Sequence, residues 1–464
     1  MATNSATIAM ENLAPELKTI AKENHQFRNW ANTFGCSPEL YFEPSTEEEV
    51  SEIVRLAVQN KKHIKVVGSG HSPSDLALTN DYMISIHKLN RVLAVNREEG
   101  IITVEAGMDL HTLHQVLKNN GMALSNLGSI SDQSVAGIMA TASHGTGTTF
   151  GSLPTMITDL TIVNGTGDIL YCSPSSNTDV FEAARCSLGC LGVITRMSLK
   201  VEPDFLLEAI QEPAKFDHVL QNWDTVINSA EHVRVWWYPH TDDCVVWRAN
   251  RTTKPVTEDK PSWFKYTFVG FHVYQFALNI ARYRQSMIPP LTRFFYDKVH
   301  STPTRVVDES YKVFNFDCLF PQYVNEWAIP LEKAPEALKR IEKFIQSSDL
   351  KVHFPVEIRF VDADDVWLSP SYGRKTCYIG VIMYRPYGKA VPYKKYWRAY
   401  EDVMRSLDGR PHWAKAHGQT KSDLERSYPK FSDFLTVREK LDPNGVFVNN
   451  YIQRHIVGKK RLAK

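Results

Sequence analysis

The sequence predicts an α+β fold built from two or three domains. Its 464 residues exceed the length of a typical single domain. Helical and strand-like patterns mix along the chain without the regular strand–helix alternation of a doubly wound fold. The chain is 43% hydrophobic and 23% charged, as in globular proteins. Its 53 basic and 52 acidic residues leave a net charge of +1, so we expect no nucleic-acid partner.

The first clear element is a helix that begins after Ser45 and Thr46. These hydroxyl residues precede Glu48 and Glu49 by three positions, which is the spacing of a capping box. Apolar residues between positions 50 and 58 then recur at helical spacing. The pattern predicts a helix that ends near Asn60.

The remaining elements of the first half follow in order. The patterns predict strands over 63–67, 82–86 and 101–105, a helix over 109–120 that Gly121 stops, a hairpin of 157–163 with 169–171, a short helix starting at 181–185, and a loop and strand over 189–199. Aromatic residues become dense after residue 203. Alternating segments at 352–360 and 377–384 indicate a second sheet, and the last 60 residues favour helices and loops.

Two glycine-rich runs stand out in the first half. Gly68, Ser69 and Gly70 follow a predicted strand, where backbone N–H groups can bind a phosphate. A Rossmann fingerprint would require a third glycine at Pro73, so a classical NAD fold is disfavoured. The second run, 128–147, is rich in glycine, serine, alanine and threonine, which lets the backbone approach a large flat ligand. Together the runs favour a dinucleotide site.

Longer motifs resemble a known family. The stretches VVGSGHSPSD (66–75), NLGSISDQSVAGIMATASHGTG (126–147) and GCLGVIT (189–195) resemble the FAD-binding flavoproteins of the vanillyl-alcohol-oxidase type. The stretches VEIRF (356–360), MYRPYGK (383–389), RPHWAKAHG (410–418) and LDPNGVFVNNY (441–451) resemble the sugar-1,4-lactone oxidases, and most closely those that act on L-gulono-1,4-lactone or D-arabinono-1,4-lactone.

The resemblance implies four segments. They are an N-terminal extension (1–37), an FAD-binding domain (38–203), a substrate-binding cap domain with an antiparallel sheet (204–400) and a C-terminal segment that returns to the flavin (401–464). It also implies FAD attached covalently through His71, whose neutral imidazole is a nucleophile. The other cofactor-binding residues that it implies are Gly68, Ser69, Gly70, Ser72, Gly128, Ser134, Gly137, Ser143, His144, Gly145 and Ile194.

Four residues are candidates for the catalytic role. Glu357 and Arg359 alternate on a predicted strand and therefore share one face, which fits either a surface ion pair or a paired active-site carboxylate and guanidinium. The resemblance favours the active site: Arg359 would stabilise developing negative charge and Glu357 would bind substrate hydroxyls. It also implies that Lys415 assists the reacting hydroxyl and that Ser129 contacts substrate.

The activity implied is oxidation of an aldono-1,4-lactone at its second carbon by hydride transfer to the flavin. Dioxygen would then be reduced to hydrogen peroxide, and the product would be ascorbate or an analogue. Gly128 stands where a related plant dehydrogenase has a slightly larger residue that limits oxygen access, which favours an oxidase. The alternative is an aldonolactone dehydrogenase that passes electrons to a protein acceptor such as cytochrome c.

Other features concern metals, thiols and location. The seven cysteines are odd in number and lack a C-x-x-C pair, so we expect reduced thiols, with Cys186 and Cys190 buried rather than bound to metal. No metal-binding pattern is evident. Residues 1–25 lack a secretory signal, which predicts an intracellular protein. The aromatic segment 263–296 is interpreted in the first place as a core helix; the second interpretation is peripheral membrane contact, at the endoplasmic reticulum or mitochondrion.

Overall fold

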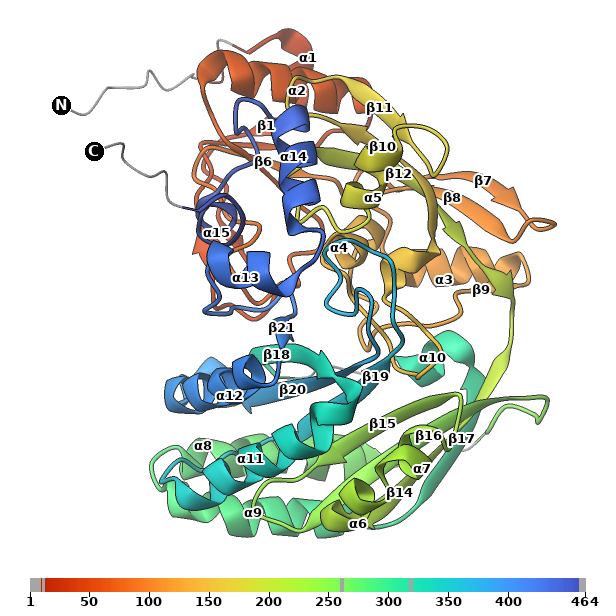
Figure 1. The fold of residues 1–464 in the computed structure, drawn as a ribbon, viewed down its shortest axis with the longest axis vertical. Coiled ribbons are helices and arrows are strands. Elements are labelled where there is room, and N and C mark those ends of the chain that lie inside the picture. The colour runs from red at the N-terminus through yellow and green to blue at the C-terminus, as the bar shows by residue number, and fades with distance from the viewer. Residues whose placement is uncertain (1–9, 11–12, 259–262, 317–319, 459–464) are drawn as a thin grey trace.

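The computed structural model describes residues 10, 13–258, 263–316 and 320–458 and confirms a mixed α+β chain. One half contains the residues before about position 203 together with the C-terminal segment (Figure 1). The other half is one large sheet with its helices. The chain therefore passes from the first half to the second and back again, which brings residues far apart in sequence to the boundary between the halves.

Helix α2 (Glu47–Asn60) confirms the predicted capping box. The Thr46 hydroxyl accepts a hydrogen bond from the Glu49 backbone N–H, and the Glu49 carboxylate accepts one from the Thr46 backbone N–H. These two bonds satisfy N–H groups that a helix start leaves unpaired. The apolar face, which includes Val50, Ile53 and Val54, is buried against the core of this half.

Two sheets organise the first half. The four-stranded sheet has the order β1-β4-β6-β5, with β4, β6 and β5 parallel, and the five-stranded sheet β11-β10-β12-β8-β7 is antiparallel. Their bounds are Ala21–Lys22 (β1), Leu40–Phe42 (β4), Ile64–Val67 (β5), Tyr82–Ser85 (β6), Val92–Asn96 (β7), Ile101–Glu105 (β8), Ile157–Val163 (β10), Ile169–Cys172 (β11) and Val193–Lys200 (β12). The predicted strands and the hairpin are confirmed, whereas the mostly exposed β7 was not predicted.

Short helices and strand pairs complete this half. Helix α3 starts after Asp109, whose carboxylate accepts the Thr112 N–H, and ends before Gly121, which has a φ of +68° as the predicted stop requires. The other elements are α1 (Pro15–Ile20), α3 (Leu110–Asn119), α4 (Val135–Ala140), α5 (Thr178–Ala184), the 3₁₀ turn Leu153–Met156, and the pairs β2 (Phe27–Arg28) with β3 (Gly35–Cys36) and β9 (Met122–Ala123) with β13 (Glu202–Pro203).

The second half is built on an antiparallel sheet of eight strands, which confirms the sheet predicted for the second domain. Its order is β17-β14-β16-β15-β19-β20-β18-β21. The strands are β14 (Leu206–Lys215), β15 (His232–Trp237), β16 (Asp243–Thr252), β17 (Thr304–Glu309), β18 (Gln322–Pro330), β19 (Val356–Val361), β20 (Thr376–Tyr384) and β21 (Arg410–Pro411). Strands β19 and β20 are the two that the sequence predicts.

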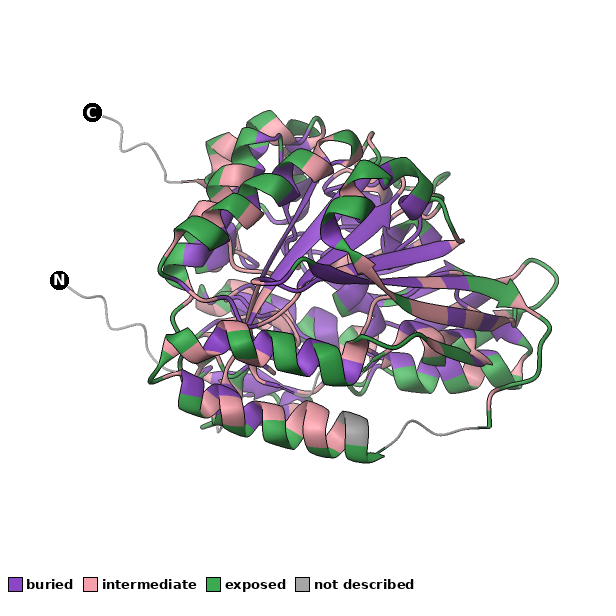
Figure 2. Ribbon diagram, turned by 90° about the horizontal axis from the view of Figure 1, so that it is seen from below, coloured by how far each residue is buried: buried purple, intermediate pink, exposed green. Residues whose placement is uncertain are grey.

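The two faces of this sheet differ in character. One face is apolar, with Val235, Ile358 and Ile379 packed beneath the helices α6 (Phe216–Gln221), α7 (Trp223–Ile227), α11 (Ala334–Ser347) and α12 (Lys394–Ser406). Figure 2 shows the buried strands beside helices whose outer surfaces are exposed. Because side chains alternate along a strand, Glu357 and Arg359 lie on the opposite face. On that face Arg359 donates a hydrogen bond to the buried carboxylate of Glu326 on β18.

The aromatic segment 263–296 lies on the surface, so its interpretation as a core helix is wrong. It forms a π-helical stretch (Phe264–Val273), α8 (Tyr274–Ala281) and α9 (Ile288–Phe295), followed by Tyr296–His300. Trp263 and Phe264 are each 63% exposed and Phe276 is 58% exposed. In α8 only one side of the helix is buried, at Gln275, Leu278 and Ala281. One side of the segment packs against the sheet, and the hydrophobic residues on the other side are exposed to solvent.

The C-terminal segment packs on the first half through α13 (Lys421–Ser427), α14 (Phe431–Leu441), α15 (Asn450–Ile452) and Gln453–Val457. The Ile64 N–H donates to the Val446 carbonyl at 2.7 Å, which ties this segment to β5. The described cysteines are free thiols, and Cys186 and Cys190 are both buried as predicted; Cys318 lies outside the described residues. Among the described helices, none is long and apolar enough to cross a membrane.

Candidate active site

The first glycine loop follows β5 directly, as predicted. Gly70 adopts a φ of +69°, a left-handed conformation that glycine tolerates. A side chain at Gly68 would place its Cβ 1.9 Å from the Ser134 hydroxyl. Glycine is therefore required there because the second glycine-rich run packs directly on the first.

The second run supplies helix α4 and the loop that follows it. Ser134 lies at the N-terminus of α4. A Cβ atom added at Gly137, in the first turn, would lie 2.8 Å from the Ser134 hydroxyl oxygen. After the helix, Gly147 donates its N–H to the Phe360 carbonyl at 2.7 Å. The run therefore connects the first glycine loop to β19, the strand that carries Glu357 and Arg359.

A cavity of about 150 Å³ lies between these loops. Ten of the predicted site residues line it, although they are distant in sequence: Gly68, Ser69, Gly70, His71, Ser72, Ser134, Gly137, Ser143, Ile194 and Lys415. Small residues with backbone N–H and hydroxyl donors form one side, and His412 and Lys415 from the C-terminal segment form another. This donor set suits a phosphate-containing dinucleotide such as FAD.

Three predicted cofactor residues do not line this cavity. Gly145 is needed for packing, because a Cβ there would lie 2.1 Å from the Asn126 side-chain oxygen. His144 points toward the large sheet, where its ring stacks on Tyr378 with centroids 3.5 Å apart. At Gly128 a Cβ would meet only the His144 carbonyl, at 3.7 Å, so this position has room for a methyl group.

His71 is half-buried at the edge of the cavity. Its Nδ1 is buried and lacks a hydrogen-bond partner, and its ring stacks on Trp30 with centroids 5.6 Å apart. Burial lowers the pKa of His71, and the nearby Lys415 charge lowers it further, although Asp132 opposes the shift. The imidazole is therefore neutral near pH 7, the form that can act as a nucleophile. An unpaired, neutral imidazole beside the cavity fits attachment to a flavin.

The sheet face beyond the cavity carries a buried group of charges. Glu357 and Arg359 lie on β19. The Arg359 Nη2 group donates a hydrogen bond of 2.8 Å to Glu326 Oε1 on β18. The Glu357 carboxylate lies 3.5 Å from the same guanidinium nitrogen. Although burial disfavours the charged guanidinium, the two carboxylates raise the pKa of Arg359 above its usual value. The candidate carboxylate and guanidinium are therefore paired inside the protein and not on its surface.

Glu326 is a buried residue of this group that the sequence did not reveal. Its Oε1 lies 3.4 Å from His144 Nε2, and its Oε2 lies 3.9 Å from Lys415 Nζ. Burial alone would raise the pKa of Glu326, but Arg359, His144 and Lys415 together hold it well below its usual range. The only signal in the sequence is a single carboxylate that follows Asn325 and precedes the apolar residues 327–329. The carboxylate links the cap sheet to Lys415 of the returning segment.

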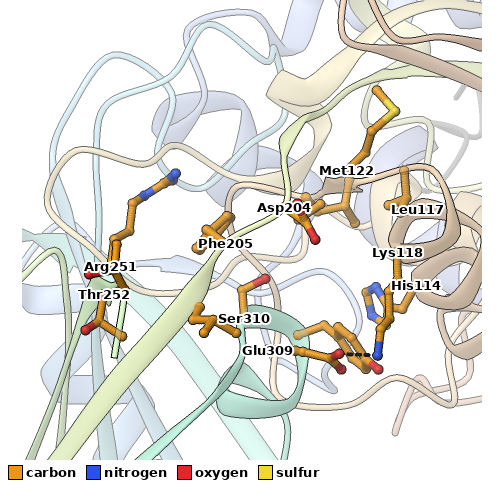
Figure 3. A pocket seen from close by; sticks show the side chains of 15 residues that line it. His114, Leu117, Lys118, Met122, Asp204, Phe205, Arg251, Thr252, Glu309 and Ser310 are labelled. Atoms are coloured by element: carbon orange, nitrogen blue, oxygen red, sulfur yellow. Dashed lines mark ion pairs between the residues drawn. The ribbon is translucent and has the colours of Figure 1, made fainter. Parts of the chain in front are cut away.

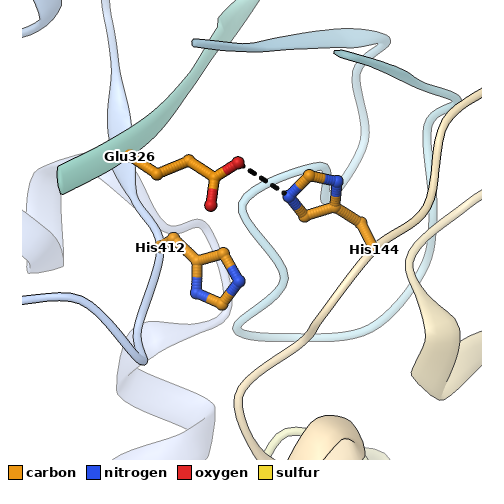
Figure 4. A group of neighbouring side chains, drawn as sticks. All are labelled: His144, Glu326 and His412. Carbon is orange, nitrogen blue, oxygen red and sulfur yellow. Dashed lines mark ion pairs between the residues drawn. The ribbon is translucent and has the colours of Figure 1, made fainter. Parts of the chain in front are cut away.

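Figure 4 shows the Glu326 carboxylate beside the rings of His144 and His412. The potential ligand atoms of these three residues all lie within 4.8 Å of one another. Two histidines and a carboxylate are a common metal-binding set. Here, however, the carboxylate already bonds to Arg359 and faces Lys415. A divalent cation would meet these positive charges at close range. The cluster is better suited to orienting charge around a bound substrate.

Arg234 lies beside Glu357, and Ser129 is connected to Arg234 through Phe316. The Ser129 hydroxyl is buried without a partner, and its carbonyl accepts the Phe316 N–H at 3.0 Å. Arg234 on β15 is buried beside β19, with its Nε 3.7 Å from Glu357 Oε1. Burial lowers the pKa of Arg234 to about 10, despite the opposing effect of Glu357, so the guanidinium is still charged at pH 7.

A larger cavity, of about 750 Å³, lies elsewhere, between α3, β14 and α10 (Ser310–Phe314). Figure 3 shows its charged side chains. Lys118 forms an ion pair with Glu309, and Arg251 pairs with Glu202. Lys118 and Arg251 are thus already paired, whereas the smaller cavity is lined by His71, whose buried Nδ1 lacks a hydrogen-bond partner among the described residues, and by Lys415. We therefore take the smaller cavity as the candidate active site.

Comparisons with known proteins show the family to which the chain belongs. Residues 197–455 match the family described as D-arabinono-1,4-lactone oxidase, and residues 38–173 match the FAD binding domain. The chain is 44% identical to L-gulonolactone oxidases of Scyliorhinus torazame, over 93% of this chain and 98% of the relative, and of Bos taurus, over 92% and 98%. It is 34% identical to the D-arabinono-1,4-lactone oxidase of Kluyveromyces lactis, over 93% and 96%.

The fold is also similar to that of solved structures. A cholesterol oxidase from Brevibacterium sterolicum aligns with a TM-score of 0.80 at 15% sequence identity, covering 97% of this chain and 99% of that one. At this level of identity the likeness concerns the fold. It supports the FAD-binding architecture that the resemblance implied, with an antiparallel sheet in the second half.

Proposed function

Because the chain belongs to the aldonolactone oxidase family of FAD-dependent oxidoreductases, we propose that it oxidises an aldono-1,4-lactone at the second carbon. The substrate is L-gulono-, L-galactono- or D-arabinono-1,4-lactone, and the organic product is ascorbate or an analogue. Dioxygen is the electron acceptor and is reduced to hydrogen peroxide. The observation that carries the proposal is the position of Lys415: it lines the cofactor cavity and also faces the buried Glu326–Arg359 pair.

The residues of the two glycine-rich runs would hold the cofactor. Backbone and hydroxyl donors at 68–72, with Ser134 and Ser143, suit the pyrophosphate, and Ile194 lines the same cavity. His71 would carry the covalent bond, which its unpaired Nδ1 and neutral ring favour. Bound FAD supplies the two-electron acceptance that turns the alcohol into a ketone and the return of those electrons to dioxygen.

The sheet face would bind the sugar lactone. Glu357 Oε1 is a buried acceptor without a hydrogen-bond partner among the described residues, and it can accept a hydrogen bond from a substrate hydroxyl. Arg359, kept charged by its two carboxylates, can stabilise negative charge that develops on the substrate oxygen. Lys415 can bond the reacting hydroxyl and assist departure of its proton. Ser129, also without a partner, offers a further hydroxyl from the opposite loop.

We also propose that residues 263–296 contact a membrane surface, as in a peripheral protein of the endoplasmic reticulum or mitochondrion. Exposed aromatic and aliphatic side chains gather on this segment: Trp263, Phe264, Phe268, Phe276, Ile280, Tyr283 and Phe294. Exposed apolar patches of this kind mark interaction surfaces, and aromatic side chains are favoured at the boundary of lipid and water.

The main test is anaerobic mixing of the holoenzyme with a panel of aldonolactones. We expect at least one of the three named lactones to bleach the flavin absorbance and subsequent admission of air to restore it with production of hydrogen peroxide. Recovery only after addition of cytochrome c would instead indicate the dehydrogenase. No bleaching by any lactone would refute the proposed function.

The covalent bond is tested with His71→Ala. Flavin should remain with the wild-type polypeptide after acid precipitation but pass into the supernatant with the variant, because no other imidazole is expected to replace His71. The exposed His218 provides the control: His218→Ala should retain its flavin. Flavin that stays bound in His71→Ala, or leaves the wild type, would contradict the proposed link.

Oxygen access is tested with Gly128→Ala. The added methyl group fits without a clash, so folding and anaerobic reduction should be preserved. Re-oxidation of the reduced enzyme by dioxygen should slow several-fold, because small molecules cross a packed interior only through specific gaps. Stopped-flow measurement of both half-reactions makes the comparison. Unchanged oxygen reactivity would remove Gly128 from the oxygen path.

Membrane contact is tested by co-sedimentation with phosphatidylcholine–phosphatidylserine vesicles. The double variant Phe264→Ser/Phe276→Ser should bind at least about tenfold more weakly than the wild type, because each buried aromatic side chain contributes about 1.5–3 kcal/mol. The matched control Leu93→Ser/Tyr171→Ser removes apolar groups that are 42% and 51% exposed on the first half. Equal losses in both variants, or a wild type that does not bind, would count against this surface.

A further inference from the structure

Among the described residues, buried polar atoms without hydrogen-bond partners gather on the inner face of the large sheet. They include Arg234 Nε and Nη2, Glu357 Oε1 and Arg359 Nε, with the Ser129 hydroxyl on the facing loop. Buried polar groups are nearly always hydrogen-bonded in native proteins, because an unmet donor or acceptor is costly. So many unmet groups in one place indicate that a ligand rich in hydroxyl groups completes them.

Arg234 is the least satisfied of these residues. It lies directly opposite Arg359 in the register of β15 and β19, so both side chains share the inner face. Its one ionic neighbour is Glu357, and the 3.7 Å between the two atoms is too long for a hydrogen bond. Arg359, in contrast, is held by Glu326 at 2.8 Å. The proposed reaction assigns Arg234 no task.

Aromatic rings surround the Arg234 guanidinium. Its central carbon lies 5.3 Å from the ring centroid of Trp236, 5.1 Å from that of Trp247 and 5.0 Å from that of Phe316. These rings stabilise the cation through their faces. They accept none of its N–H groups, so Arg234 keeps donors free for a ligand while the rings exclude competing water.

The position of Arg234 indicates which part of a substrate it would meet. Lys415 and Glu326 lie on the side of β18 and β21, whereas β15 is the next strand beyond β19 on the other side. Adjacent strands are about 4.8 Å apart, so Arg234 is about one strand farther from Lys415 than Glu357 is. The Phe316 N–H donates to the Ser129 carbonyl and connects this aromatic group to the loop that carries Ser129.

We propose that Arg234 binds the hydroxyl groups of the exocyclic side chain of the aldonolactone and thereby selects lactones that carry them. This inference rests on the proposed function. A lactone whose reacting hydroxyl lies at Lys415 extends past Glu357 toward Arg234, which donates to the distal hydroxyls. Arg234 is then a specificity-determining residue that takes no part in the chemical step.

A purely positioning role makes a different prediction. If Arg234 only oriented Glu357, its loss would weaken every lactone equally, because Glu357 contacts groups that all of them share. Substrates with and without the side chain therefore separate the two roles. L-gulono-1,4-lactone carries an exocyclic diol, whereas L-threono-1,4-lactone has hydroxyl groups on the ring alone.

The experiment compares the affinity of both lactones for the oxidised holoenzyme, by perturbation of the flavin absorbance and by inhibition of turnover. Arg234→Met keeps the length of the side chain and removes the donors. We expect binding of L-gulono-1,4-lactone to weaken at least about tenfold, the effect of losing one charge-assisted hydrogen bond. Binding of L-threono-1,4-lactone should change little. The control Arg248→Met alters an arginine of β16 that bonds to Glu212 and Ser229, outside the site, and should leave both affinities unchanged.

An equal loss for the two lactones, or no loss for either, would overturn the inference. Should the methionine variant fail to fold, Arg234→Lys decides by the same comparison, because lysine keeps the charge but cannot present two donors in one plane. The lactone panel with the wild type separates failure of the proposed function from failure of the inference about Arg234. A wild type that no lactone reduces refutes the proposed function, whereas an active wild type whose preference survives in Arg234→Met refutes this inference alone.

Discussion

The buried ion pair between Arg359 and Glu326 is the interaction on which the rest of the site depends. It joins β19 to β18 across β20, at a point where the intervening strand offers only Gly380 between the carboxylates of Glu357 and Glu326. Two carboxylates keep the guanidinium charged despite its burial, and the cations in turn keep Glu326 ionised. Removal of one partner would leave an uncompensated charge inside the protein, which is far more costly than the pair itself. The site is therefore fixed in its charge state before any ligand enters.

The same site depends on how closely the two halves approach each other. Gly68 and Ser134 bring the two cofactor loops into contact, and Gly147 then bonds to the Phe360 carbonyl, next to Arg359. His232 Nδ1 lies 2.8 Å from the Thr146 carbonyl and adds a second connection to β15. Because the Gly147 and Thr146 contacts involve the backbone of the second glycine-rich run, they transmit position with little freedom. They set the distance between the loops that suit the cofactor and the charges that suit the substrate, which any hydride transfer requires to be short.

The outer surface is organised separately from this interior. The exposed aromatic side chains of 263–296 lie on helices beside the sheet, and the helices α11 and α12 cover its apolar face. The charged inner face is closed by the first half of the chain and by the returning C-terminal segment. A protein arranged in this way can present an apolar surface without disturbing its active site, since the exposed aromatic residues named above are not among those that line the candidate cavity.

The sequence by itself determined the elements whose signals are local: the capping box of α2, the stop of α3 at Gly121, the hairpin of β10 and β11, and the two glycine runs. Long motifs also determined the family, and through it ten residues that line one cavity. Only the tertiary structure decided the roles of Glu326 and Arg234, because a lone charge in an apolar stretch has no periodicity and acquires its meaning from strands paired across the sheet. It also decided that the aromatic segment is exposed, since hydrophobicity in sequence does not state which side a neighbouring sheet will cover.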